Sequence, residues 1–84
     1  MKILRISAVL DETGHRSDAS IYNAVKDGLF TKPVRIGQRA VGWPQSEVHA
    51  INAARIAGCS MVQIQELVEQ LHMRRSSFLV PPDL

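Results

Sequence analysis

The stretch that decides the fold covers residues 8–28, which read AVLDETGHRSDASIYNAVKDG. Gly14 interrupts this stretch, and a glycine readily adopts the left-handed conformation that ends many helices. Ser17 is a typical helix N-cap residue. The pattern therefore predicts one helix over about 8–13 and a second from the Ser17 cap to about 27. Two short helices joined by a tight, glycine-containing turn are typical of a helix-turn-helix.

The second of these helices has one apolar face. Ile21, Ala24 and Val25 follow the helical spacing i, i+3 and i+4, so we expect this face to pack on a core. Ser7 is expected to cap the first helix as Ser17 caps the second.

An extended region follows the two helices. Residues 33–36 and 40–43 flank the turn 37–39 and predict a β-hairpin with a basic tip. Pro44 is expected to break the second strand, and a brief strand is expected over 2–6. A helix-turn-helix followed by a hairpin is a winged helix. The predicted fold class is therefore α+β, mostly α, with a small β-hairpin wing and an extra C-terminal helix.

Two more helices are expected after the hairpin. Ser46 is expected to cap the third helix, and Gly58 to end it. The fourth helix is expected to begin near Met61, because Ser60 and Gln63 have the spacing of a capping box.

The fourth helix carries an apolar stripe made of Met61, Ile64, Leu67, Val68 and Leu71. Such a stripe either folds back onto its own domain or pairs with a second copy of the chain. We favour the homodimer slightly, because a small core gains stability from oligomerisation. Its predicted interface consists of Ile64, Leu67, Val68 and Leu71.

The length of 84 residues suits one small domain. We assign residues 1–58 to the winged helix-turn-helix, 59–75 to an appended helix for which dimerisation is one of the two expected roles, and 76–84 to an extended or disordered tail. No apolar run approaches the roughly 20 residues of a membrane-spanning helix, and the N-terminus does not have the pattern of a signal peptide. With a single cysteine, Cys59, these features favour a cytoplasmic protein with no membrane partner.

Charge is distributed unevenly along the chain. Residues 1–43 carry seven Lys and Arg against four Asp and Glu, whereas residues 44–84 carry three against four. A basic front half suits a polyanionic partner such as nucleic acid.

The sequence offers no chemistry for an enzyme. His15, His49 and His72 do not have the spacing of metal ligands. Residues 37–42 space their glycines like a phosphate-binding loop, but Trp43 follows where such a loop needs lysine. We therefore predict no catalytic residue, no metal and no cofactor.

A helix-turn-helix places its second helix in the major groove of DNA, with the wing along the backbone or in the minor groove. Asparagine can pair with adenine, serine can donate or accept, and lysine and arginine reach guanine or phosphate. Tyr22 is equally suited to a half-buried core position, and Trp43 is expected in the core. The predicted DNA contacts are Arg16, Ser17, Ser20, Tyr22, Asn23, Lys26, Lys32, Arg35 and Arg39.

Several short motifs, which follow one another in a fixed order along the chain, resemble those of a known family. They include the Thr13-Gly14 turn, Ser20-Ile21-Tyr22, Lys26-Asp27-Gly28, Lys32-Pro33-Val34, the run Arg39-Ala40-Val41-Gly42-Trp43 and Ser46-Glu47-Val48. From about residue 2 to 57 the chain resembles the AlpA-type prophage regulatory proteins, a branch of the MerR-like and excisionase-like winged helices.

This resemblance implies a DNA-binding protein that controls transcription, or the direction of recombination, in a mobile element. It implies that Ser17, Ser20, Tyr22 and Lys26 lie in the recognition helix and Arg39 in the wing. Three features depart from the family pattern: a turn longer by one residue at 15–16, Asp18 where arginine is common, and Asn23 at a frequently basic position.

Three functions stay open at this point. The first is a sequence-specific regulator of a prophage or mobile element that binds double-stranded DNA. The second is an excisionase that bends DNA beside an integrase. The third is a protein-interaction module that has lost DNA binding, which is motivated by Asp18 and the modest net charge of +2.

Overall fold

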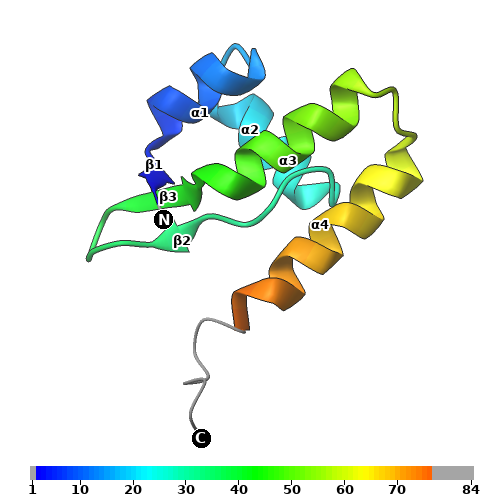
Figure 1. The fold of residues 1–84 in the computed structure, drawn as a ribbon. Helices are drawn as coiled ribbons and strands as arrows, with labels where there is room; N and C mark the ends of the chain where they lie inside the picture. Colours follow the sequence, from blue (N-terminus) through cyan, green and yellow to red (C-terminus); the bar gives the residue numbers. More distant parts are fainter. Residues whose placement is uncertain (1, 77–84) are drawn as a thin grey trace, which may run out of the picture.

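A computed structural model describes residues 2–76 and contains the expected helix-turn-helix (Figure 1). Its two helices are α1 (Ile6–Thr13) and α2 (Asp18–Lys26). Gly14 follows α1 with a φ of 78°, in the left-handed region, and its N–H donates to the Leu10 carbonyl. The expected end of the first helix is therefore confirmed.

The cap of α2 is also confirmed. The Ser17 side chain accepts a hydrogen bond from the Ser20 N–H, which also donates to the Ser17 carbonyl, so an N–H in the first turn of the helix is satisfied. Ile21 and Ala24 are buried and Val25 is partly buried. The predicted apolar face thus packs on the core, which leaves the other side of α2 to solvent.

The start of α1 differs from the prediction. The helix begins at Ile6, with Arg5 in extended conformation as its N-cap and no side-chain cap. Ser7 therefore lies inside the helix. The Val9 N–H donates to the Arg5 carbonyl at 3.1 Å, so the first helical bond forms before Ser7 could cap anything.

Three short strands form one antiparallel sheet in the order β1-β3-β2. β2 (Val34–Arg35) and β3 (Val41–Pro44) make the hairpin, and β1 (Ile3–Leu4) pairs with the other edge of β3. We call residues 34–44 the wing. The fold is thus a mostly helical α+β fold, as predicted.

Pro44 corrects two sequence expectations. It pairs with Ile3 as the last residue of β3, so it does not break the strand before it. It is also the N-cap residue of α3 (Gln45–Ile56), so Ser46 lies within the helix and caps nothing. A proline suits this junction, because the first turn of a helix does not need its missing N–H.

The fourth helix, α4 (Met61–Arg75), begins where expected. Ser60 and Gln63 form the predicted capping box, in which each side chain bonds the backbone N–H of the other residue. Figure 1 shows α4 running antiparallel to α3 and back toward the base of the wing.

The apolar stripe of α4 takes the first of its two alternatives and folds back onto its own domain. Ile64, Val68 and Leu71 are buried in the core that the other helices share, and Leu67 packs against it partly buried. These side chains are therefore not a free dimer interface. Met61 does not join the stripe, since it is 64% exposed. The helices on either side of the boundary expected after Gly58 therefore contribute to the same hydrophobic core.

Trp43 and Phe30 lie at the centre of that core. Trp43 has no exposed surface and Phe30 is 1% exposed, and their ring centroids are 6.0 Å apart. The prediction that Trp43 belongs to the core is confirmed. Within residues 2–76 no helix is long and apolar enough to cross a bilayer. The predicted tail, apart from Ser76, lies outside the described residues.

Gly42 is required by the close approach of β1 to β3. A Cβ at this position would lie 2.5 Å from the Ile3 Cγ2 and 2.8 Å from the Leu4 carbonyl oxygen. We expect Gly42→Ala to lower the free energy of unfolding by about 1–3 kcal/mol, because the strands must separate to admit the methyl group.

Chemical denaturation measures this change. Gly37→Ala is the matched control, since its added Cβ would meet only the Ala40 Cβ at 3.8 Å, an ordinary contact. Equal stability of the two variants would contradict the steric argument.

Candidate nucleic-acid interface

The predicted DNA-contacting residues fall in three segments: the turn before α2, α2 itself, and the wing with the residue that leads into it. In chain order they are Arg16 and Ser17, then Ser20, Tyr22, Asn23 and Lys26, then Lys32, Arg35 and Arg39. All are exposed except Ser20, which is partly buried. Exposure makes contact feasible, and contact with DNA stays a prediction.

Two of the predicted serines already have partners inside the protein. The Ser17 hydroxyl oxygen caps α2, and it can still donate its hydrogen outward. The Ser20 hydroxyl lies 2.5 Å from the Nδ1 of His15. That bond fixes the imidazole beside the first turn of α2, so Ser20 is less available for a base than a solvated serine.

Tyr22 is both anchored and exposed. Its ring is tilted by 57° against the Trp43 ring, with centroids 6.0 Å apart, and 43% of the residue remains exposed. One face of the side chain therefore packs on the core, and the rest is open to a ligand. Asn23 and Lys26, on the same helix, are exposed.

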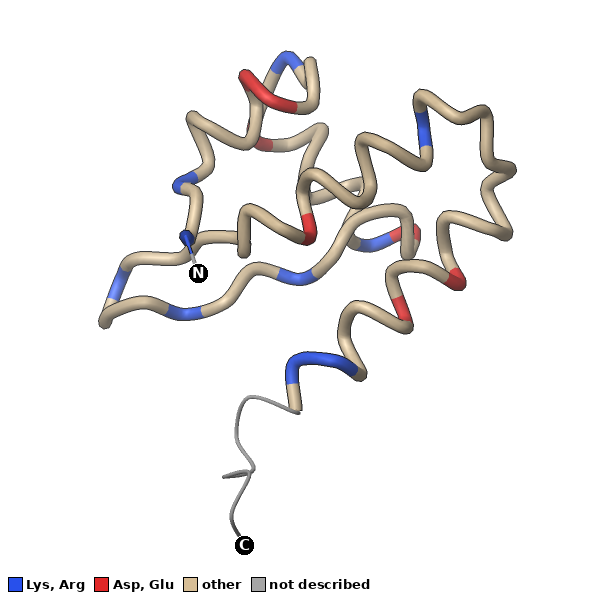
Figure 2. The backbone as a smooth tube through the Cα atoms, viewed as in Figure 1, with Lys and Arg blue, Asp and Glu red and all other residues tan. Residues whose placement is uncertain are grey.

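The wing and the two residues that lead into it are basic. Residues 32–44 contain two arginines and one lysine and no Asp or Glu, and Figure 2 shows these positions following the hairpin toward its tip. The tip is closed by a hydrogen bond from the Ile36 N–H to the Ala40 carbonyl at 2.9 Å. Arg35 and Arg39 project from this short hairpin as exposed side chains.

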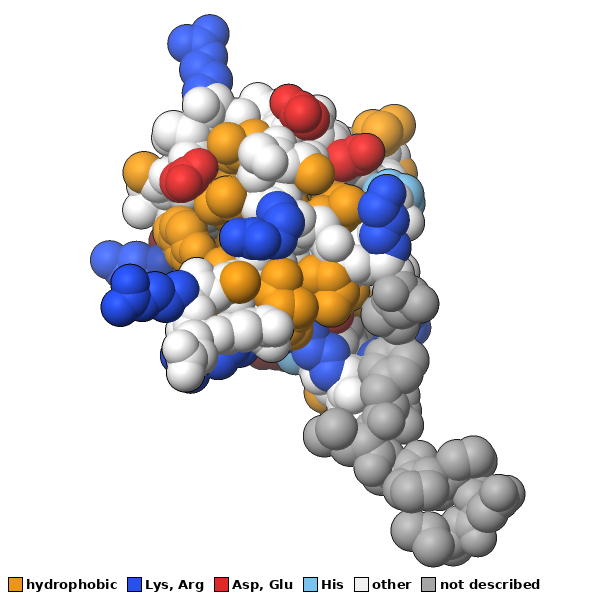
Figure 3. All heavy atoms as spheres, turned by 90° about the vertical axis from the view of Figure 1, so that its left-hand side faces the viewer, with side chains coloured by type: hydrophobic (Ala, Val, Ile, Leu, Met, Phe, Trp, Pro, Cys, Tyr) orange, Lys and Arg blue, Asp and Glu red, His pale blue; other side chains and the backbone are white. Residues whose placement is uncertain are grey.

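Hydrophobic side chains also reach the surface beside these charges. Ile3 of β1 is 39% exposed and Ile36 of the wing 45% exposed. Figure 3 shows hydrophobic side chains on this side of the molecule, with Lys and Arg beside them and Asp and Glu in the upper part of the view. The Lys and Arg side chains of this face can contact phosphate oxygens, whereas apolar side chains cannot.

The structure adds one basic residue that sequence reasoning missed. Arg55, in the last turn of α3, lines one hollow together with His15, Arg16 and Ser20. The pKa of His15 is lowered, first by burial and then by the nearby Arg55 charge. No local pattern could have revealed this, because α3 and the turn before α2 are far apart in sequence.

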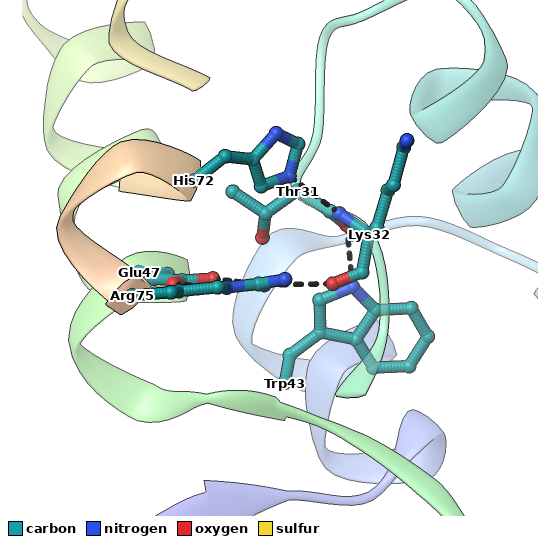
Figure 4. Close-up of polar contacts among 6 residues, drawn as sticks. All are labelled: Thr31, Lys32, Trp43, Glu47, His72 and Arg75. Carbon is teal, nitrogen blue, oxygen red and sulfur yellow. Dashed lines mark hydrogen bonds and ion pairs between the residues drawn. The ribbon is translucent and has the colours of Figure 1, made fainter. Parts of the chain in front are cut away.

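A second group that the sequence did not reveal surrounds the segment 31–32, which leads into the wing (Figure 4). Trp43 Nε1 donates to the Thr31 carbonyl at 2.7 Å. The Lys32 N–H donates to His72 Nε2 at 3.0 Å, and Arg75 Nη2 donates to the Lys32 carbonyl at 2.7 Å. Glu47 holds Arg75 through two hydrogen bonds.

A scan against family models matches residues 2–55 to the prophage CP4-57 regulatory protein (AlpA) family. The chain belongs to this family of regulatory proteins. Searches of curated proteins and of solved structures gave no match. The AlpA family is generally non-enzymatic, and the described residues contain no group of three or more His, Cys, Asp or Glu side chains placed to hold a metal ion.

The AlpA match spans α1, α2, the sheet and nearly all of α3, and it ends before α4. Within the run Arg39-Ala40-Val41-Gly42-Trp43, Gly42 and Trp43 have structural roles, whereas Arg39 is exposed on the wing. Glu47 is 5% exposed and pairs with Arg75. A buried residue of the matched segment thus finds its partner outside that segment.

The contact between His72 and Lys32 makes stability depend on pH. Burial lowers the pKa of His72 below its ordinary 6.5, and Arg75 lowers it further, although Glu47 acts in the opposite direction. The folded protein therefore binds this proton less readily than the unfolded chain does. The resulting stability is present above about pH 6.5 and is lost as pH falls through the lowered pKa.

We expect the free energy of unfolding to fall between about pH 7.5 and about pH 5, and to fall less in His72→Gln. Glutamine can still accept the Lys32 N–H bond but takes up no proton. Denaturation curves at several pH values measure the difference. The pKa of His15 is also lowered, so the free energy of unfolding of His72→Gln should still depend on pH in part. If it depends on pH as steeply as that of the wild type, His72 is not the residue responsible.

Proposed function

We propose that this AlpA-family protein binds double-stranded DNA in a sequence-specific manner and regulates transcription of a prophage or mobile element. The main support for the proposal is that α2 and the wing, the two elements expected to contact DNA, are attached to the same residue of the core. Tyr22 of α2 packs on Trp43 of β3, and β3 is also the second strand of the basic wing. The exposed side of α2 and the wing are therefore held at a fixed spacing.

In this proposal α2 enters the major groove. Asn23 can bond the N6 and N7 of adenine as a pair, and Lys26 can reach guanine or a phosphate. Ser17 and the Tyr22 ring complete the surface that faces the bases. Asp18, in the first turn of α2, disfavours a nearby phosphate but can accept from the N4 of cytosine, which makes it a candidate for discrimination between bases.

The wing supplies affinity that does not depend on sequence. Arg39 near the tip and Arg35 in β2 are exposed guanidinium groups on a segment without carboxylates. An arginine on a wing either follows the backbone or enters a narrow minor groove, where the potential is most negative. Each phosphate contact releases counterions and so makes binding weaker as salt rises.

The test is a titration of the full chain into labelled random-sequence duplex DNA at several salt concentrations. We expect affinity to fall steeply with salt, and Arg39→Ala to bind more weakly with a salt slope smaller by about one unit. Arg74→Ala is the control, since it removes the same charge from α4. An equal effect of both variants would show a general charge effect and contradict the assignment of Arg39 to the interface.

A footprint on selected DNA distinguishes the remaining functions. An isolated operator supports a transcription regulator, whereas a cluster of direct repeats beside a recombination site supports an excisionase that works with an integrase. No binding even at low salt would overturn DNA binding, and would leave a protein-interaction module.

A further inference from the structure

Lys32 is held by α4 at both of its backbone polar groups. His72 accepts the Lys32 N–H and Arg75 donates to the Lys32 carbonyl, and both residues come from the last turns of α4 (Figure 4). Two such bonds fix the position and the orientation of the peptide groups on either side of Lys32. Pro33, with a restricted φ, follows directly, and β2 begins one residue later.

Arg75 is itself held in a fixed position. Its Nε and Nη2 donate to the two carboxylate oxygens of Glu47 at 2.8 and 2.6 Å, in the planar fork geometry that makes such pairs strong. The side chains of Glu47 and Arg75 are only 7% and 24% exposed. Since Glu47 lies in the first turn of α3, the guanidinium joins α3, α4 and the entry to the wing.

A largely apolar groove of about 470 Å³ lies beside this attachment. Its lining includes Val34 and Arg35 of β2 and Leu71 and Arg74 of α4. The hydrogen bonds at Lys32 therefore join α4 to the chain at the point where it enters the wing, next to a groove that side chains do not fill.

We propose that Arg75 and His72 are positioning residues that set the orientation of the wing relative to α2. On this account α4, which lies outside the segment matched to the AlpA family, is part of the DNA-binding unit. The inference rests on the proposed function, because a wing needs a fixed orientation only if it contacts a partner together with α2.

Two other roles for Arg75 give different results. If Arg75 only stabilised the fold, its loss would weaken binding in proportion to the unfolded fraction. If Arg75 touched DNA itself, its loss would add to the loss of any other contact. A positioning role acts through Arg35 and Arg39, so its effect depends on whether these two arginines are present.

The experiment is a double-mutant cycle on the full chain, with a short random-sequence duplex as the probe and circular dichroism to verify that each variant is folded. We expect Arg75→Gln to weaken binding by about threefold or more when the wing arginines are present. In an Arg35→Ala/Arg39→Ala background the same substitution should have less than about a twofold effect. In a Lys26→Ala background the full effect should remain, because Lys26 lies on α2.

Arg74→Gln is the matched control, because it removes the same charge one residue away. Arg75→Gln leaves the Glu47 carboxylate buried without its partner, so this variant is expected to lose stability. His72→Ala is therefore the second variant: it releases the Lys32 N–H and leaves the ion pair between Glu47 and Arg75 intact. If Arg75→Gln does not fold, His72→Ala is measured in the same three backgrounds.

An equal effect in all three backgrounds, or no effect in a folded variant, would overturn the positioning role while DNA binding by the wild type stands. Absence of binding by the wild type would overturn the proposed function itself and, with it, this inference. Hydrogen exchange of the free protein adds a readout that needs no DNA. The Ile36 N–H, bonded within the wing, should exchange at the wild-type rate in His72→Ala if the hairpin is reoriented but still formed.

Discussion

The hydrogen bond from Trp43 Nε1 to the Thr31 carbonyl joins the central strand of the sheet to the segment that enters the wing. A buried indole needs a partner for its N–H, because an unsatisfied donor in the core costs free energy. In this protein the partner is a backbone carbonyl, so the same bond that satisfies the tryptophan also fixes the chain. The Trp43 ring contacts Phe30 in the core and Tyr22 on α2. One side chain thus relates the sheet, the helix and the wing.

In the segment that matches the AlpA family, some residues have a structural role and others are exposed on the surface. Gly42 lets β1 approach β3, Trp43 fills the core, and Glu47 is buried with Arg75. Arg39, at the start of the same run, is exposed. Substitution of the first three would act mainly through the fold, whereas substitution of Arg39 would act on the surface that we propose for DNA. The distinction matters for any comparison of mutants in this region.

Local patterns in the sequence predicted the parts of the fold that local interactions determine. Gly14, Ser17 and Ser60 have the predicted conformations and caps, since each depends on residues within one turn of helix. Ser7 and Ser46 have the same side chain but cap nothing, because the backbone enters both helices earlier, from β1 and from Pro44. In α1 and α3 the position of the N-cap residue therefore depends on where the preceding strand ends.

The contacts that complete the candidate site could not be predicted in this way. His72 and Arg75 meet Lys32 only because α4 folds back along α3, and the sequence left open whether its apolar stripe would do so. Arg55 lines the same hollow as His15 for a similar reason. Such pairs depend on how the helices pack, and neither residue type nor spacing carries a signal for them.

The central claim is that α2 and the wing together form the surface that binds DNA. Titration of duplex DNA into isotopically labelled protein, followed by backbone amide chemical shifts, tests it residue by residue. The account predicts shifts over residues 16–26 and 34–41, with none on the exposed positions Val62 and Glu66 of α4. Shifts confined to α4, or absent from the wing, would contradict it.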